Sequence, residues 1–258
     1  MPRVHPSAAV DPGAKLAADV EVGPFAVVGP EVELAAGVLL KPHALVTGRT
    51  RIGERTRVFP FAVLGEEPQD KSFSGESTRL EIGADNVIRE HAVIHVGTEK
   101  GGGCTRIGDD NLIMNGVHIG HDGQVGSHVI LASHAALGGH VTIEDFAVVG
   151  GLSGVHQMAR VGESAMVAAL SGVSKDAPPF SLMSGSRARM VGVNVVGLKR
   201  RGFSEETRAG IKRAFRLLFG SKLRLEPALA RAKQEFRDCP EVQRLVRFVE
   251  TSARGVSR

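Results

Sequence analysis

Aliphatic residues recur at every sixth position through most of the chain, and this period constrains the fold more than any other feature of the sequence. The series runs without a slip through 4–64, resumes over 82–94 and continues over 107–173. Neither an α-helix, with a period of 3.6 residues, nor a half-buried strand, with a period of two, produces it. A hexapeptide repeat is typical of a parallel β-helix, in which three short strands form one triangular coil of about 18 residues.

The aliphatic residue of each hexad is expected to point inward and to stack on the one in the coil below. About nine or ten coils follow, and at about 4.8 Å per coil they predict a prism on the order of 45 Å long. A glycine often comes directly after the aliphatic residue, as at Gly53, Gly108, Gly126 and Gly162. This position indicates a tight turn that needs a small residue or one with positive φ.

The repeat ends near residue 178, which predicts two domains. Residues 1–186 form the β-helix, with polar loops inserted at 66–79 and 97–106, and residues 187–258 form a small C-terminal α-helical domain. We expect a linker through Arg189 and then three helices, the first with Ser204 as its N-cap, the second near 225–237 and the third beginning at Pro240. The fold is therefore mainly β, with helices that cover the last open edge of the prism.

Charge is divided unevenly between these two parts. Residues 1–186 carry 14 Lys and Arg against 21 Asp and Glu, whereas residues 187–258 carry 18 against 7. A basic patch suits nucleic acid, an anionic lipid, an acidic protein or a phosphate-bearing ligand, and its sign alone does not choose among them. The tail lacks the interleaved aromatic residues expected of a protein that binds single strands, so nucleic acid is not expected.

The sequence predicts a cytoplasmic protein. The N-terminal MPRVHPSAAV has no apolar signal region, and no apolar run marks a membrane span, which would need about 18 such residues. Cys104 and Cys239 lie far apart and match no metal-ligand spacing, so we expect reduced thiols.

Several histidines fall in phase with one another. Because one coil takes about 18 residues, positions one coil apart stack, and histidines beside in-phase aliphatic residues should converge on one edge of three successive coils. These histidines are His118, His121, His140 and His156. His128 and His134 fall at other phases and are expected to be part of the scaffold.

Two kinds of chemistry can use such a cluster. Three imidazoles can bind Zn²⁺, as in a γ-class carbonic anhydrase, or one imidazole can act as a general base. Asp122 follows His121, and a carboxylate bonded to one ring nitrogen raises the basicity of the other. Gly139 lies one coil above His121, where a bare backbone N–H suits a developing oxyanion. Acyl transfer without a metal is the more economical interpretation, and a non-catalytic hexapeptide scaffold is the third possibility.

Specific motifs carry a family resemblance over essentially the whole chain. They are PQD at 68–70, GEST at 75–78, HIGHD at 118–122, GGH at 138–140, GVHQ at 154–157 and NVVGLKRRGF at 194–203. Together with the hexads they resemble the UDP-N-acetylglucosamine O-acyltransferases, which open lipid A biosynthesis. A sister N-acyltransferase family usually carries an additional N-terminal domain, whereas the hexads here begin at Val4.

The resemblance implies a left-handed β-helix and a homotrimer with active sites between subunits. It also implies transfer of a 3-hydroxyacyl chain from acyl carrier protein to the 3-hydroxyl of UDP-N-acetylglucosamine. The acyl carrier protein, with its phosphopantetheine-linked chain, is then the co-substrate, and no other cofactor is expected. The basic tail suits this acidic partner.

The resemblance also assigns roles to residues. His121 is implied as the general base, Asp122 as its orienting partner and the Gly139 backbone as the oxyanion donor. The implied substrate contacts are Asp70, His118, His140, His156 and Gln157. The implied ligands of the uridine diphosphate are Asn194, Arg200 and Arg201, since the forked guanidinium suits phosphate. The candidates for an acyl-chain groove are Ala169, Met166 and Met158.

The chain departs from its relatives at three of these places. Lys71 stands one position before the lysine of relatives, and Val196 replaces a glutamate that some carry near the nucleotide sugar. Ala169 replaces a glycine at the floor of the groove, where a methyl group shortens the preferred chain. The acyl length, and the choice between a 3-hydroxyl and a 3-amino acceptor, stay open.

Overall fold

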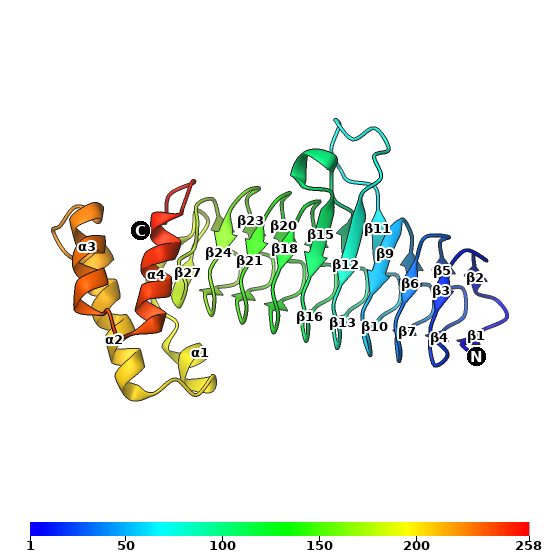
Figure 1. Cartoon of the computed structure of the whole chain (residues 1–258), viewed down its shortest axis with the longest axis horizontal. Coiled ribbons are helices and arrows are strands. Elements are labelled where there is room, and N and C mark those ends of the chain that lie inside the picture. The colour runs from blue at the N-terminus through cyan, green and yellow to red at the C-terminus, as the bar shows by residue number, and fades with distance from the viewer. Residues whose placement is uncertain (258) are drawn as a thin grey trace.

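Three parallel sheets form an elongated triangular prism with helices packed at its C-terminal end (Figure 1). The computed structural model describes residues 1–257. The chain passes from sheet A to sheet B to sheet C in each coil, as the hexads predict, and each sheet gains one strand per coil. The predicted β-helix is confirmed.

Sheet A consists of β1 (Arg3–Val4), β4 (Glu21–Val22), β7 (Leu39–Leu40), β10 (Arg57–Val58), β13 (Val87–Ile88), β16 (Leu112–Ile113), β19 (Ile130–Leu131), β22 (Val148–Val149), β25 (Met166–Val167), β27 (Ser181–Ser184) and β28 (Arg189–Val193). Sheet B consists of β2 (Ala9–Val10), β5 (Val27–Val28), β8 (Leu45–Val46), β11 (Val63–Glu66), β14 (Val93–His95), β17 (His118–Ile119), β20 (Ala136–Leu137), β23 (Gly154–Val155) and β26 (Gly172–Val173). Sheet C consists of β3 (Lys15–Leu16), β6 (Glu33–Leu34), β9 (Arg49–Ile52), β12 (Arg79–Ile82), β15 (Cys104–Ile107), β18 (Gln124–Val125), β21 (Thr142–Ile143) and β24 (Arg160–Val161).

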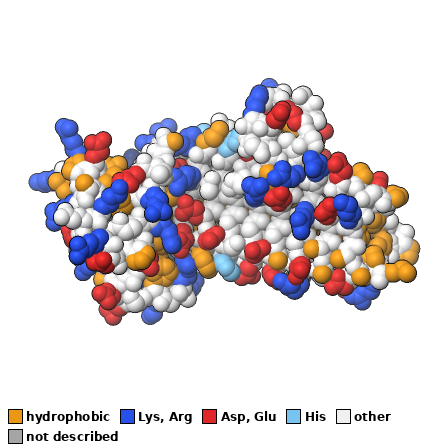
Figure 2. Space-filling view, in the orientation of Figure 1, with side chains coloured by type: hydrophobic (Ala, Val, Ile, Leu, Met, Phe, Trp, Pro, Cys, Tyr) orange, Lys and Arg blue, Asp and Glu red, His pale blue; other side chains and the backbone are white. Residues whose placement is uncertain are grey.

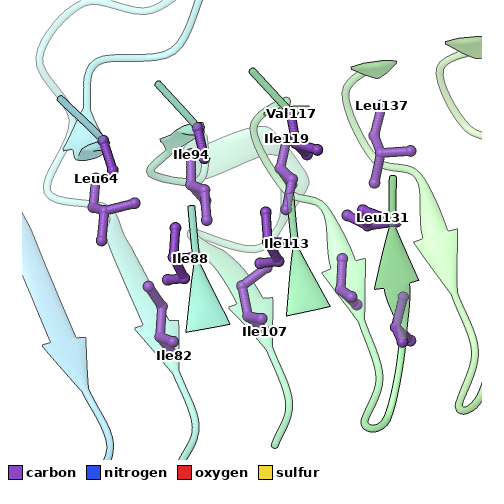
Figure 3. Packing of buried hydrophobic residues seen from close by; sticks show 14 of the residues in the cluster. Leu64, Ile82, Ile88, Ile94, Ile107, Ile113, Val117, Ile119, Leu131 and Leu137 are labelled. Atoms are coloured by element: carbon purple, nitrogen blue, oxygen red, sulfur yellow. The ribbon is translucent and has the colours of Figure 1, made fainter. Parts of the chain in front are cut away.

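The core is a stack of aliphatic side chains that come from the three sheets. Leu64, Ile94, Ile119 and Leu137 lie one above another inside sheet B and are fully buried (Figure 3). Neighbouring coils pair in register, for example Ile119 with Leu137. Burial of a side chain of this size stabilises the fold by about 1.5–3 kcal/mol, so the stack fixes the register of every coil.

The three edges of the prism are the turns between sheets, which we call the AB, BC and CA edges. Most turns have one residue with positive φ, three places after the aliphatic residue, as at Asp122 (59°), His128 (58°) and His134 (59°). The residue with positive φ is not the glycine that comes directly after the aliphatic residue. A Cβ on Gly108 would lie 2.7 Å from the Gly126 carbonyl carbon in the next coil. These glycines are needed because neighbouring turns approach closely, so of the two expected reasons the need for a small residue applies and the need for positive φ does not.

The two predicted loops both leave the prism at the BC edge. The first joins β11 to β12, and the second joins β14 to β15 and contains the short 3₁₀ helix η1 (Glu99–Gly101). Figure 1 shows them side by side on the same edge. The strands on either side still pair, Leu64 with Ile94 and Ile94 with Ile119. Each loop therefore lengthens one coil without disturbing the stack.

The C-terminal part contains the three predicted helices, one α-helix that was not expected and a short π-helix. The elements are α1 (Val195–Arg200), α2 (Glu205–Phe215), the π-helix η2 (Arg216–Gly220), α3 (Leu225–Glu235) and α4 (Pro240–Glu250). Ser204 caps α2 by accepting a hydrogen bond from the Thr207 N–H, as predicted. Phe180, beneath the last coil, packs into the apolar core of these helices.

The expected linker before the helices is wrong. Residues 181–184 form β27, which continues sheet A in parallel with β25, and residues 189–193 form β28, which returns antiparallel. The domain division between residues 186 and 187 stays a prediction. Within residues 1–257, no helix has the length and apolar character that crossing a bilayer requires.

Candidate active site

The BC edge gathers most of the predicted site on successive coils. The loop with Asp70 leaves the edge first, the loop with η1 follows, and the turn after β17 then carries His121 and Asp122. The turn after β20 carries Gly139 and His140. The phase of the repeat, and not proximity in sequence, brings these groups together.

His121 and Asp122 form a hydrogen-bonded pair inside this edge. The distance from Nδ1 of His121 to Oδ2 of Asp122 is 2.8 Å. The Asp122 side chain is fully buried, whereas that of His121 is 16% exposed. Because an ionised carboxylate only accepts, Nδ1 donates the proton, and Nε2 keeps the lone pair that a general base needs.

Thr98, on the second loop, fixes the other side of the carboxylate. Its N–H donates to Oδ1 of Asp122 at 2.9 Å and its hydroxyl donates to Oδ2 at 2.7 Å. Gly101 is packed so closely that a Cβ there would lie 2.0 Å from the Asp122 carboxyl carbon. A buried carboxylate with this many donors is held in one orientation, and it holds the His121 ring in turn.

Gly139 faces the free nitrogen of His121. A Cβ on Gly139 would lie 2.6 Å from Nε2 and 2.7 Å from Cε1, so only glycine leaves this side of the ring open. Within residues 1–257, the Gly139 N–H makes no hydrogen bond, whereas its carbonyl accepts from Met158. A free N–H beside the lone pair of a base suits an oxyanion that forms there.

The other in-phase histidines lie at different distances from the pair. The His140 ring meets the His121 ring edge to face, with centroids 5.0 Å apart, and its Nδ1 lies 3.8 Å from Oδ2 of Asp122. His118 points outward from sheet B beside them. Burial and the two neighbouring histidines His95 and His121 lower the pKa of His118. His156 is exposed, with Nδ1 3.0 Å from its neighbour's carbonyl oxygen.

Asp70 is half-buried and Gln157 is exposed at the same edge. Asp70 closes its own turn by accepting from the Ser72 N–H at 2.9 Å, and these contacts with Ser72 hold its pKa below the usual range. Gln157 lies one coil above Gly139 in the same phase and is exposed. Both residues therefore leave a polar side chain open to a ligand near His121.

His95 was missed by the sequence analysis, although it is part of this cluster. It is 4% exposed, its ring meets that of His118 with centroids 5.2 Å apart, and its Nδ1 donates to the Glu67 carbonyl oxygen over 2.7 Å. Burial lowers its pKa. The signal was available, since His95 stands directly after Ile94 just as His156 stands after Val155. Counting in steps of 18 residues does not place His95 in the cluster, because the second loop adds residues between His95 and the next coil.

His128 and His134 lie elsewhere, as predicted from their phase. His128 is at the CA edge, where Nδ1 lies 2.9 Å from Oδ2 of Asp110 and the ring stacks on Phe146. Its carboxylate partner is 66% exposed. His134 is at the AB edge, and its ring fills the space above Gly116. Neither histidine contacts the His121 pair.

The tail residues assigned to the uridine diphosphate lie near the CA edge of the last coils. Asn194 caps α1 and also donates to the Ser164 carbonyl at 2.9 Å. Arg201 pairs with Glu163 at 2.8 Å and lies 3.6 Å from the Phe146 ring centroid, and burial lowers its pKa. Arg200 is exposed. Within one chain, these groups are on a different edge from His121.

The three acyl-groove candidates do not converge within one chain. Met158 is exposed at the BC edge, Met166 faces outward from sheet A, and Ala169 is exposed at the AB edge. A groove of about 520 Å³ instead runs along sheet B from His118 past small residues towards Arg187. A larger hollow of about 1220 Å³ lies on sheet C, and no histidine lines it within the described chain.

The carbonic-anhydrase alternative has a geometric basis in the same cluster. Ligand atoms of His121, Asp122 and His140 all lie within 4.8 Å of one another. However, both Asp122 oxygens already accept hydrogen bonds from Thr98 or His121. The Asp122 carboxylate therefore already serves to orient the His121 imidazole.

A prism of hexapeptide coils that carries a buried His–Asp pair beside a free backbone N–H defines a hexapeptide-repeat acyltransferase. Comparisons with known proteins agree. The family model described as "Udp N-acetylglucosamine O-acyltransferase; Domain 2" matches residues 176–257. The chain belongs to the acyl-[acyl-carrier-protein]–UDP-N-acetylglucosamine O-acyltransferase family, because curated members match it over their full length.

The member from Myxococcus xanthus is 50% identical over 258 residues, which is all of both chains, and that from Halorhodospira halophila is 47% identical over the same length. Among solved structures, LpxA from Acinetobacter baumannii has a TM-score of 0.96 and 41% identity over 99% of both chains. The UDP-N-acetylglucosamine acyltransferase from Campylobacter jejuni has a TM-score of 0.94 and 38% identity over 99% of both chains. The fold is thus the left-handed parallel β-helix. The carbonic anhydrase and scaffold alternatives are not favoured.

Proposed function

We propose that this chain transfers a 3-hydroxyacyl group from acyl carrier protein to the 3-hydroxyl of UDP-N-acetylglucosamine, the first step of lipid A biosynthesis, in the cytoplasm. The observation that carries the proposal is the His121–Asp122 pair, whose open Nε2 lies beside Gly139, a residue whose backbone N–H is free within residues 1–257. The names of full-length relatives at 43–50% identity state the acyl donor and the acceptor.

The chemistry follows from these three groups. Nε2 of His121 takes the proton of the sugar hydroxyl as its oxygen attacks the thioester carbonyl carbon. The negative charge that develops on the carbonyl oxygen is stabilised by the Gly139 N–H. The tetrahedral intermediate then expels the phosphopantetheine sulfur, which receives the proton from the His121 imidazolium. Asp122 stabilises that imidazolium through Nδ1, and general-base catalysis of this kind contributes about 10²–10⁴ in rate.

The active enzyme is proposed to be a homotrimer, because one chain holds only part of a site. The histidines are on sheet B and the BC edge, whereas Met166 is on sheet A, Ala169 is on the AB edge and Arg200 follows sheet A in the tail. If sheet A of one copy faces sheet B of the next, these groups meet. A head-to-tail contact with threefold rotation closes into a ring of three copies.

The AB edge would then face the axis of the ring, and its composition suits that position. A column of exposed side chains without formal charge runs along it. The column comprises Phe25, His43, Phe61, His91, His134, Leu152 and Leu170. The first four rings stack with centroids 5.1, 4.9 and 5.2 Å apart. Leu152 and Leu170 are 64% and 68% exposed in the single chain, and a ring would cover them.

The groove on sheet B suits the acyl chain. Outward positions of successive strands shrink from His118 to Ala136, Gly154 and Gly172, which leaves a smooth channel about 14 Å long over three strand spacings. In the ring, Met166 and Ala169 of the next copy would cover it. This arrangement keeps the three groove candidates of the sequence analysis, with Met158 at its BC rim.

The test is product analysis by mass spectrometry. Purified protein is incubated with 3-hydroxyacyl carrier proteins of several chain lengths, and with UDP-N-acetylglucosamine or its 3-amino analogue. An acylated nucleotide sugar that requires both substrates supports the proposal, and the two acceptors identify the atom that is acylated. Release of free fatty acid without an acylated sugar would contradict it.

A further inference from the structure

Helix α1 is held at both of its ends by one turn of the prism. At its N-terminus, Asn194 donates to the Ser164 carbonyl oxygen at 2.9 Å, and at its C-terminus Arg201 donates to the Ser164 hydroxyl. Ser164 is 1% exposed and occupies the positive-φ corner of the turn after β24. A helix as short as α1 is not stable alone, so this turn determines where α1 lies.

Glu163, in the same turn, provides the charge for this clamp. Its Oε1 accepts from Arg201 at 2.8 Å, and its Oε2 pairs with Arg244 of α4. The Glu163 side chain is only 12% exposed, and the planar Arg201 side chain is further held against the rings of Phe146 and Phe203. A charge-assisted contact in a partly buried place is stronger than a surface pair. Arg201 therefore anchors the C-terminal tail to the prism.

Two cations of α1 are left open to a ligand. Lys199 and Arg200 are both exposed and, within residues 1–257, take part in no ion pair. They project from a helix whose buried residue is Leu198. Lys and Arg side chains gather over this end of the molecule (Figure 2).

We propose that Glu163 and Arg201 are positioning residues that fix α1. They would thereby hold in place Arg200, whose contact with the diphosphate of the nucleotide sugar the family resemblance already implies, together with the neighbouring cation Lys199. The inference rests on the proposed function and revises the role that the resemblance implies for Arg201. Glu163 affects nucleotide affinity only through the place in which it holds α1.

The experiment measures binding of UDP by calorimetry and the KM for UDP-N-acetylglucosamine with the full-length protein. Arg200→Ala is expected to weaken UDP binding by about tenfold or more, since it removes a charge-assisted contact. Glu163→Gln keeps the shape of the side chain but releases Arg201, and should raise both UDP Kd and KM by about tenfold while kcat changes by less than about threefold. The KM for acyl carrier protein should stay unchanged.

Two further variants separate positioning from stability. Arg244→Ala removes the tie to α4 but leaves the Arg201 clamp, so it should lower the thermal midpoint as Glu163→Gln does without weakening UDP binding. In the double variant Glu163→Gln/Arg200→Ala, the loss should be smaller than the sum of the two single losses, because Glu163 and Arg200 both act through α1.

The inference is overturned if the wild-type protein is active but Glu163→Gln binds UDP normally. It is also overturned if the losses of UDP binding in the double variant are fully additive. If Arg244→Ala lost as much UDP binding as Glu163→Gln, the role of Glu163 would be only to stabilise the fold, and the inference would also be overturned. Failure of the proposed function is recognised separately, as wild-type protein that neither binds UDP nor forms product.

Discussion

The same pair of residue types occurs twice in this prism, and only one pair has the surroundings of a catalytic base. Nδ1 of His121 lies 2.8 Å from Asp122, and Nδ1 of His128 lies 2.9 Å from Asp110. The Asp122 side chain is fully buried and bonded by Thr98, whereas Asp110 is 66% exposed. A carboxylate in water reorients freely and stabilises an imidazolium weakly. The burial of the partner, and not the pair itself, distinguishes the two sites.

Gly139→Ala tests the packing beside the base. The new methyl group would lie 2.6 Å from Nε2 of His121, so the ring must move, and a displacement of about 1 Å costs about 10² in rate. We expect kcat to fall about 100-fold in a steady-state transfer assay, with the thermal midpoint nearly unchanged. Gly210→Ala is the control, since a methyl there meets only Sγ of Cys239 at 3.8 Å. Full activity in Gly139→Ala would contradict the close packing.

The buried His95 predicts a dependence of stability on pH. Burial lowers the pKa of His95 in the folded state below the ordinary 6.5. As pH falls below 6.5, His95 is therefore protonated in the unfolded chain while it stays neutral in the folded chain. The free energy of unfolding should therefore decrease with falling pH in this window, by up to about 1.4 kcal/mol per pH unit for this histidine. Above pH 6.5 the contribution of His95 to the free energy of unfolding is constant.

Urea denaturation of wild type and His95→Asn between pH 5 and 7 measures this effect. Asn keeps a donor for the Glu67 carbonyl but does not titrate, so its stability should vary less with pH than that of wild type. The other histidines are common to both proteins, and among them the substitution also removes the contribution of His95 to the lowered pKa of His118. Parallel curves for the two proteins would show that His95 titrates normally.

At the residue scale, the sequence predicted what depends on phase and missed what depends on loop length. The stacking of His121 beneath Gly139 follows from the regular step of the repeat, and both positions fall within uninterrupted hexads. His95 and Thr98 lie before or within the second loop, which lengthens the coil between Ile94 and its partner Ile119. The role of Arg201 depends on Glu163, which is distant in sequence and has no periodic relation to it.

At the scale of elements, close approach between turns matters as much as the aliphatic stack. Gly53, Gly83, Gly108 and Gly126 follow the last residue of β9, β12, β15 and β18, and each turn leaves no room for a Cβ against the next. The close neighbours are mainly backbone atoms, which cannot rotate aside as a side chain can. A substitution in this column therefore separates two coils and strains the strand pairing on both sides.

Gly108→Ala should lower the free energy of unfolding by about 1–3 kcal/mol, as overpacking does in a rigid core. The reason is that the added Cβ would lie 2.7 Å from the carbonyl carbon of Gly126. Gly220→Ala, where a Cβ meets nothing within 4 Å, should change stability by less than about 0.5 kcal/mol. Urea titrations of the two variants give the comparison, and equal stabilities would contradict the steric account.

Helix prediction succeeded where local signals were sufficient. Ser204 caps α2 and Pro240 begins α4, and both residues were identified from sequence preference alone. Helix α1 was missed because Val195, Val196 and Gly197 are poor helix formers. The contacts of Asn194 and Arg201 with the prism override that preference. β27 was missed since the hexad rhythm stops before Ser181, although the chain still adds a strand to sheet A.

At the scale of the whole molecule, the proposed ring explains why a column of aromatic, histidine and leucine side chains lies exposed on the AB edge of a single chain. The other two edges are polar or hold the site, with Arg55 and Asp85 paired at the CA edge and His121 and Asp122 at the BC edge. A column of rings and leucines costs free energy in water, about 25 cal/mol per Å² of apolar surface. Burial at a threefold axis removes that cost from all three copies.

Leu170→Glu should disrupt the ring, because it places three carboxylates close together at the axis. We expect sedimentation velocity to give the mass of a monomer, and transfer activity to fall below about 1% since each site needs two copies. Leu223→Glu, at an exposed leucine between η2 and α3, is the control and should keep both the mass and the activity of wild type. A fully active monomer would show that one chain holds a complete site.

The most direct test of the central claim compares His121→Ala with His128→Ala in the transfer of a 3-hydroxyacyl group from acyl carrier protein to UDP-N-acetylglucosamine. Each variant removes one histidine from a His–Asp pair of nearly equal length. We predict that His121→Ala lowers kcat by about 10³ or more, while His128→Ala stays within about threefold of wild type and both remain folded. Activity of His121→Ala near the wild-type value, or an equal loss in both variants, would contradict the assignment of the BC edge as the active site.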